Sequence, residues 1–143
     1  MSNKLYFAYG SNMNLNQMAF RCPDAEVVES VQAEGYRLAF RGGGVATIRP
    51  EEGGRVEGVL WRVSADDERS LDRYEGYPRL YGKEEIRVLL PDGSQVSTMA
   101  YCMNYPYAAH PAMPSRSYLA GILEGYRQHG LATKAAREAA TRP

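Results

Sequence analysis

Short hydrophobic stretches, separated by turns that contain glycine or proline, dominate the sequence. Seven of them predict strands, at residues 4–9, 27–31, 36–41, 45–49, 56–63, 84–90 and 95–103. The clearest strand, 56–63, carries hydrophobic residues at both alternating sets of positions, so both of its faces are expected to be partly buried. The connections at 42–44, 50–54 and 91–94 are short turns, which favour antiparallel pairing of neighbouring strands.

Helical patterns occur at three places between or after these strands. Asn12 or Asn14 can cap a short helix that ends near residue 20. Ser64 can cap a second helix over 64–74, whose first turn holds three acidic residues that the helix dipole favours. The longest helix, 115–129, places its hydrophobic residues on one stripe and therefore has one face to bury.

Together these elements predict an α+β (mixed α/β) fold. We expect a small, mainly antiparallel, barrel-like sheet of about six to seven strands with two to three helices against it. The length of 143 residues is typical of one domain. That domain is expected over 1–131, followed over 132–143 by a polar, alanine-rich tail that is either a frayed helix or disordered.

Composition narrows the function classes. The 17 lysines and arginines balance 17 aspartates and glutamates, so no overall charge favours nucleic acid or an anionic membrane surface. No hydrophobic run approaches the roughly 20 residues that span a bilayer, and no secretory signal is recognisable, so we expect a cytoplasmic protein. Two cysteines provide neither a disulfide framework nor a metal ligand set. Eleven tyrosines, each with an apolar ring and a polar tip, suit a wet pocket or an interface.

The segment Tyr9-Gly10-Ser11-Asn12 is a candidate binding loop. A strand enters a glycine turn and a helix can follow, so consecutive backbone N–H groups can converge on an anion, with Ser11 and Asn12 adding side-chain donors. The same pattern is also ordinary turn chemistry at the end of a strand. The lysine of a phosphate-binding loop and the Gly-x-Gly-x-x-Gly spacing are absent, so the pattern does not support nucleotide binding.

Glu75 is a candidate general acid/base. It ends a predicted helix, where the dipole disfavours a negative charge, and the neighbouring Tyr74 and Tyr77 can reduce its solvation. Both effects raise the pKa of a carboxyl group toward neutrality, as proton transfer near pH 7 requires. The alternative is a solvated surface glutamate, or one that is paired with Arg79 or Lys83.

The remaining polar residues form no recognisable catalytic pattern. Asp72 lies three residues before Glu75 and could either share its site or face water, of which we expect the second. The two histidines, at 110 and 129, do not combine with a cysteine in a supported nucleophile pattern. No serine has the context of a nucleophile elbow, and nothing is similar to a metal site.

Several motifs, taken in order, resemble those of the γ-glutamylcyclotransferase-like superfamily over residues 4–131. They are the segments 5–12, 21–25, 35–40, 46–48, 56–61, 71–76 and 114–118, together with Tyr81 and Gly130-Leu131. Each motif by itself is weak, but their order and spacing are specific to the superfamily.

The resemblance implies a small, barrel-like mixed α/β fold and an enzyme that closes a γ-glutamyl amide into 5-oxoproline, releasing the amine without a cofactor or a metal. In this resemblance Tyr9-Gly10-Ser11-Asn12 matches the loop whose backbone amides hold the substrate carboxylate. Glu75 matches the catalytic acid/base, and Tyr81 and Tyr118 match pocket tyrosines. The expected partner is a small γ-glutamyl molecule, and the chain is expected to be a monomer or a homodimer.

Two segments, 42–44 and 105–110, follow no pattern of the superfamily and would shape the side of the pocket that holds the released amine. An amide hydrolase or acyltransferase on the same scaffold is one alternative function. A non-catalytic small-molecule-binding module is a second. A structural domain that uses Tyr105 and Tyr107 at an interface is a third.

Overall fold

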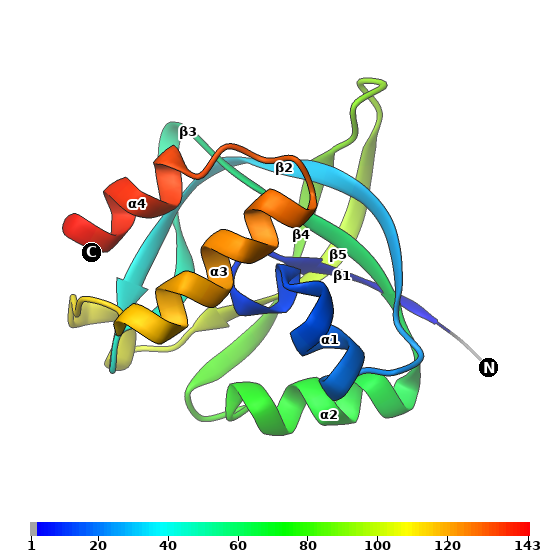
Figure 1. The fold of residues 1–143 in the computed structure, drawn as a ribbon, viewed down its shortest axis with the longest axis horizontal. Coiled ribbons are helices and arrows are strands. Elements are labelled where there is room, and N and C mark those ends of the chain that lie inside the picture. Colours follow the sequence, from blue (N-terminus) through cyan, green and yellow to red (C-terminus); the bar gives the residue numbers. More distant parts are fainter. Residues whose placement is uncertain (1–2) are drawn as a thin grey trace.

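Five strands close into a barrel (Figure 1) in the computed structural model, which describes residues 3–143. They are β1 (Lys4–Ala8), β2 (Glu26–Arg41), β3 (Val45–Val63), β4 (Tyr81–Leu89) and β5 (Gln95–Met103). Their order around the barrel is β1-β3-β2-β4-β5, and all neighbours are antiparallel except β5 and β1, which close the barrel in parallel. The predicted mixed fold with a mainly antiparallel, barrel-like sheet is confirmed.

The predicted number of strands is wrong, because two pairs of predicted strands are continuous. Segments 27–31 and 36–41 both belong to β2, and segments 45–49 and 56–63 both belong to β3. The β2–β3 ladder passes from the pair Glu34 and Arg55 directly to the pair Tyr36 and Pro50. The predicted turn at 50–54 is therefore largely an irregularity inside one strand, opposite Gly35, whose φ of +86° only glycine adopts readily.

The chain forms more helices than the two to three predicted. Four α-helices are present among residues 3–143, together with the short 3₁₀ turns η1 (Ser11–Met13) and η2 (Tyr107–Ala109). The α-helices are α1 (Leu15–Arg21), α2 (Ala65–Glu75), α3 (Arg116–Gln128) and α4 (Lys134–Thr141). Among these helices, none combines the length and the apolar character that crossing a membrane requires.

The additional helix, α4, occupies the segment that was expected to be a polar tail. Ala136, Ala139 and Ala140 lie on one face at helical spacing and are buried, and α4 packs against β2. Its small apolar face is therefore sufficient to dock it, although the rest of the helix is polar. The boundary between a domain and a tail at residue 131 stays a prediction, and residues 1 and 2 of that domain lie outside the described residues.

Local capping explains where α1 and α2 begin and end. The side chain of Asn14, one of two predicted caps, accepts hydrogen bonds from the backbone N–H groups of residues 16 and 17 at the start of α1. Ser64 and Asp67 form a reciprocal capping box at the start of α2. Gly76, with φ of +66°, ends α2 directly after Glu75. The backbone thus turns away at the residue that follows the candidate acid/base.

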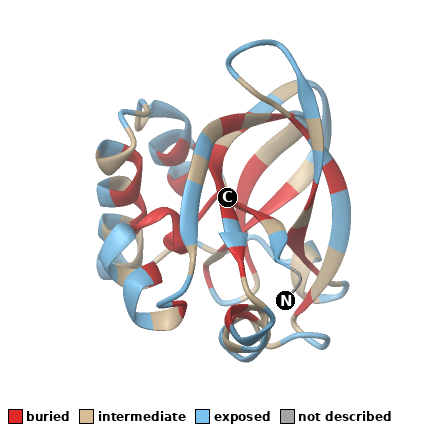
Figure 2. Cartoon of the chain, turned by 90° about the vertical axis from the view of Figure 1, so that its right-hand side faces the viewer, coloured by how far each residue is buried: buried red, intermediate tan, exposed pale blue. Residues whose placement is uncertain are grey.

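Helix α3 holds η1 in place, directly after β1. Asn14 Nδ2 donates a hydrogen bond of 3.0 Å to the carbonyl oxygen of Gly121, and His129 Nε2 lies 2.7 Å from the carbonyl oxygen of Met13. Between these contacts, Gly125 has no side chain and lets the helix approach closely. Figure 2 shows buried residues concentrated along the strands of the barrel and on the sides of the helices that face it.

We predict that Gly125→Ala lowers the free energy of unfolding although alanine favours a helix. The added methyl group would lie 2.9 Å from the backbone nitrogen of Asn14 and 3.0 Å from Cβ of Met13. Overpacking of about 1–3 kcal/mol should outweigh the gain of about 1 kcal/mol in helix propensity. Chemical denaturation measures the difference. Gly43→Ala, where an added Cβ meets nothing within 4 Å, is the control and should change stability by less than about 0.5 kcal/mol. Equal stability of the two variants would contradict the role of Gly125.

Candidate active site

One cavity of about 260 Å³ collects the candidate residues at the end of β1. Its volume is slightly below the roughly 300–1,000 Å³ of sites for drug-sized ligands, so it suits a small molecule. All seven site residues singled out from the sequence line it: Tyr9, Gly10, Ser11, Asn12, Glu75, Tyr81 and Tyr118. The two motifs at 9–12 and 71–76, far apart in the sequence, therefore meet at one place.

The loop at 10–12 offers backbone donors to this cavity. The N–H of Met13 donates to the carbonyl oxygen of Gly10 as the first hydrogen bond of η1. The N–H groups of Ser11 and Asn12 precede that bond, so they have no partner within the turn, and no side chain caps it. An added Cβ on Gly10 would lie 3.1 Å from Cβ of Ala46, so the loop runs close to β3.

Asn12 supports the loop through its own contacts. Its Nδ2 donates to the hydroxyl oxygen of Tyr6 at 3.0 Å, and its Oδ1 accepts from Arg21 Nη1 at 2.6 Å. Its backbone carbonyl accepts from Trp61 Nε1 at 3.1 Å. The side chain of Asn12 thus holds the loop in place.

Glu75 is the last residue of α2 and lies partly buried in the wall of the cavity. Burial raises the pKa of its carboxyl group to about 7, against an opposing effect of the Arg21 charge. The desolvation of the carboxylate is therefore the principal cause of the shift. Neither alternative partner pairs with Glu75, because Arg79 donates to the hydroxyl of Tyr107 and Lys83 binds other carboxylates.

Tyr74, the residue before Glu75, contacts both η1 and Arg21 of α1. The hydroxyls of Tyr74 and Ser11 are 2.8 Å apart, and the Arg21 guanidinium lies 3.6 Å from the centre of the Tyr74 ring. Tyr74 thus bridges α2 to η1 although it is 42% exposed. Tyr77, which was expected to shield Glu75 as well, does not line the cavity. The sequence did not indicate a role for Arg21, because its partners Asn12 and Tyr74 lie in other elements, η1 and α2.

Tyrosines form most of the remaining wall. Tyr81 donates its hydroxyl proton to the carbonyl oxygen of Ala46, whereas the Tyr118 hydroxyl accepts from the N–H of Ala46 at 3.0 Å. Burial raises the pKa of Tyr6, Tyr81 and Tyr118, so these hydroxyls stay protonated at neutral pH. Because Tyr118 and Tyr6 both accept in the contacts described, each keeps a proton that it can donate to a ligand.

Tyr6 and Tyr101 also line the cavity and were not predicted. They come together because β1 and β5 close the barrel, and their rings are 5.7 Å apart in an edge-to-face arrangement. The hydroxyl of Tyr9 donates to the carbonyl oxygen of Tyr101 at 2.6 Å, which ties the two strands at this point. No local signal indicates this pairing, because it depends on the closure of the sheet.

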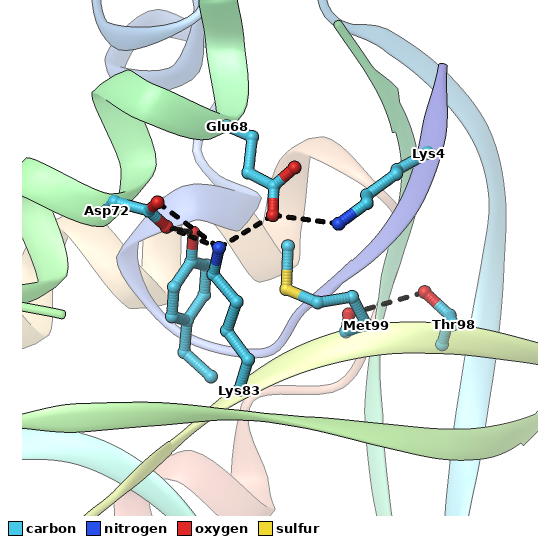
Figure 3. Close-up of polar contacts among 7 residues, drawn as sticks. Lys4, Glu68, Asp72, Lys83, Thr98 and Met99 are labelled. Atoms are coloured by element: carbon cyan, nitrogen blue, oxygen red, sulfur yellow. Dashed lines mark hydrogen bonds and ion pairs between the residues drawn. The ribbon is translucent and has the colours of Figure 1, made fainter. Parts of the chain in front are cut away.

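The expectation that Asp72 faces water is wrong. Its carboxylate lies 2.9 Å from Lys83 Nζ and accepts a hydrogen bond of 2.6 Å from the hydroxyl of Tyr101. Lys83 also binds Glu68 at 2.7 Å, and Glu68 binds Lys4 at 3.0 Å (Figure 3). These contacts fasten α2 to β1, β4 and β5, and they hold the helix that carries Glu75 at its end.

The site thus combines three kinds of groups. A carboxyl group whose pKa is raised to about 7 lines the same cavity as the loop at 10–12 and the hydroxyl-bearing Tyr6 and Tyr118. Such a set can bind a carboxylate, move a proton and polarise a carbonyl group. Within residues 3–143, no group of three or more His, Cys, Asp or Glu side chains is placed to hold a metal ion.

Comparisons with known proteins agree on one family. Residues 6–120 match the family model described as gamma-glutamyl cyclotransferase, AIG2-like. The human protein named gamma-glutamylcyclotransferase is 32% identical over 139 residues, which cover 89% of this chain and 72% of that protein. The mouse protein of the same name is 33% identical with the same coverage. A solved structure titled gamma-glutamyl cyclotransferase superposes with a TM-score of 0.87 at 28% identity, covering 96% of this chain and 86% of that one. The chain therefore belongs to the gamma-glutamyl cyclotransferase, AIG2-like family.

Proposed function

We propose that this protein cleaves γ-glutamyl amides by intramolecular cyclisation, forming 5-oxoproline and releasing the amine. The observation that carries the proposal is the placement of Glu75, with a pKa of about 7, in the same small cavity as the backbone donors of Ser11 and Asn12. The names of the relatives support the same reaction class. The partner is a small molecule that carries a free glutamyl group.

Binding places the two reacting ends of the glutamyl group next to each other. The α-carboxylate of the substrate accepts hydrogen bonds from the N–H groups of Ser11 and Asn12. This contact directs the α-amine and the γ-carbonyl carbon toward Glu75. Holding the chain in a folded conformer supplies part of the roughly 7–11 kcal/mol that proximity can contribute to an intramolecular reaction.

Glu75 then acts first as a base and afterwards as an acid. Its carboxylate takes a proton from the α-ammonium group, and the freed amine attacks the γ-carbonyl carbon, forming the C–N bond of the ring. The developing oxyanion accepts a hydrogen bond from the hydroxyl of Tyr118 or Tyr6, whose protons are available. Glu75, now protonated, gives its proton to the amide nitrogen as that C–N bond breaks and the carbonyl re-forms. The regenerated carboxylate takes the second proton from the ring nitrogen and passes it to the released amine, which leaves as an ammonium ion. One carboxyl group near its pKa serves both steps.

We predict that Glu75→Gln lowers kcat by at least about 10²-fold while leaving binding of a glutamyl ligand largely intact, because the amide keeps the shape but transfers no proton. Mass spectrometry of 5-oxoproline released from γ-glutamyl dipeptides measures the rate. Glu85→Gln, an exposed change on β4, is the matched control and should retain full activity.

One result would contradict this prediction, and two others would contradict the proposed function. Near-normal turnover in Glu75→Gln would remove Glu75 from the chemistry. Free glutamate in place of 5-oxoproline would identify a hydrolase, and tight ligand binding by the wild-type protein without turnover would identify a non-catalytic binding module.

The pH profile provides an independent prediction. A base with a pKa of about 7 is charged above that pH, so kcat/KM should fall about tenfold per unit as the pH drops below about 7. The Arg21 charge lowers the pKa of Glu75, so Arg21→Gln should move this acidic fall in kcat/KM to higher pH. Arg69→Gln, which changes an exposed arginine on α2, is the control and should leave the pH at which kcat/KM falls unchanged. If Arg21→Gln leaves the acidic side of the pH profile unchanged, or moves it to lower pH, the titration belongs to a group other than Glu75.

A further inference from the structure

Tyr74 joins the two parts of the candidate active site. It belongs to α2 and directly precedes Glu75, and both residues line the cavity. Its hydroxyl lies 2.8 Å from the hydroxyl of Ser11 in η1, which lines the same cavity. A single side chain therefore connects the loop at 10–12 to the helix that carries the carboxyl group.

The direction of the Ser11 hydroxyl depends on this contact. Ser11 is only 6% exposed, and among residues 3–143 its side chain has no hydrogen-bond partner other than Tyr74. A serine hydroxyl rotates to suit its partners, so the bond to Tyr74 determines where it points. Without that bond the buried hydroxyl would have no partner in the described part of the chain, which is unfavourable.

The chemistry of the two hydroxyls favours Tyr74 as the donor. A phenolic O–H is more acidic than an aliphatic O–H and is therefore the stronger hydrogen-bond donor. When Tyr74 donates, the proton of Ser11 remains available for a ligand in the cavity. Successive hydrogen bonds polarise one another, so the O–H of Ser11 then donates more strongly than an isolated hydroxyl would.

Arg21 holds the ring of Tyr74 in position. Its guanidinium carbon lies 3.6 Å from the centre of that ring, and its Nη1 donates to Oδ1 of Asn12 at 2.6 Å. The cation–π contact restrains the ring although Tyr74 is 42% exposed. Helices α1 and α2, which supply these two side chains, lie side by side (Figure 1). The contacts thus run in a closed circuit that begins and ends in η1: Ser11, Tyr74, Arg21 and Asn12.

We propose that Tyr74 is a positioning residue that directs the hydroxyl of Ser11 toward the carboxylate of the bound glutamyl group. The hydroxyl then adds a third donor to the backbone N–H groups of residues 11 and 12. Hydrogen bonds to a charged acceptor are about twice as strong as neutral ones, so a correctly directed hydroxyl strengthens binding. This inference rests on the proposed cyclisation, and it assigns a role to a residue that acts on the substrate through Ser11.

Tyr74→Phe tests the proposal, because it removes the hydroxyl and keeps the ring that Arg21 contacts. With γ-glutamylalanine as substrate and release of 5-oxoproline as the measurement, KM should rise about three- to tenfold, while kcat changes less than about twofold. The pH at which kcat/KM falls should stay unchanged, since Glu75 and Arg21 are both retained. Tyr77→Phe, which removes a hydroxyl from a tyrosine outside the cavity wall, is the control and should keep the wild-type KM.

A double-mutant cycle separates this role from a purely structural one. Ser11→Ala should raise KM by about the same factor as Tyr74→Phe. If Tyr74 acts through Ser11, the double variant should have a KM no higher than either single variant. A contact that only stabilises the fold would lower the melting temperature of Tyr74→Phe and leave its KM at the wild-type value, which would overturn the inference.

The other outcomes separate this inference from the proposed function. A lower kcat with an unchanged KM in Tyr74→Phe, or increases in KM that multiply in the double variant, would overturn the inference and leave the cyclisation standing. No release of 5-oxoproline by the wild-type protein would overturn both. If Tyr74→Phe fails to fold, Ser11→Ala decides the question, because a wild-type KM in that variant would show that the hydroxyl contacts no substrate.

Discussion

The site depends on keeping a carboxyl group partly out of water at the end of a helix. Desolvation makes the charged form of Glu75 less favourable and brings its pKa to about 7. That position costs stability, because a free carboxylate would be better solvated. The protein maintains it by fastening α2 elsewhere, through the capping box at Ser64 and the contacts of Asp72 and Lys83. The anchored helix holds its last residue, Glu75, in the wall of the cavity.

Closure of the barrel provides the environment of that carboxyl group. The parallel contact of β1 and β5 brings Tyr6 and Tyr101 together, and the hydrogen bond from Tyr9 to Tyr101 ties the same strands. Aromatic rings exclude water, while their hydroxyls satisfy nearby backbone groups or remain able to donate. Six of the eleven tyrosines of the sequence line this pocket, which is therefore both apolar and rich in hydroxyl groups: Tyr6, Tyr9, Tyr74, Tyr81, Tyr101 and Tyr118.

Positive and negative charges are equal in number over the whole chain, but they are unevenly distributed in the fold. The equal numbers of acidic and basic residues conceal an acidic cluster neutralised by Lys4 and Lys83 beneath α2 and a pair of arginines on β2 and β3, Arg41 and Arg49. The first cluster is satisfied and serves structure. The second shares one neutral acceptor, the carbonyl oxygen of Ala108, and among the described residues it has no carboxylate partner. Overall charge argued against nucleic acid, but only the arrangement of charges distinguishes these two places.

The sequence by itself determined the features that depend on neighbouring residues. Capping by Ser64, the end of α2 at Gly76, the strand at 95–103 and the placement of Glu75 at a helix end all follow from short-range chemistry. The contiguous motif at 9–12 was identified for the same reason. Tertiary structure alone decided the continuity of β2 and β3, the docking of α4, the partners of Asp72 and the contributions of Tyr6, Tyr101 and Arg21. Each of these depends on a contact between segments far apart in the chain, which local pattern does not encode.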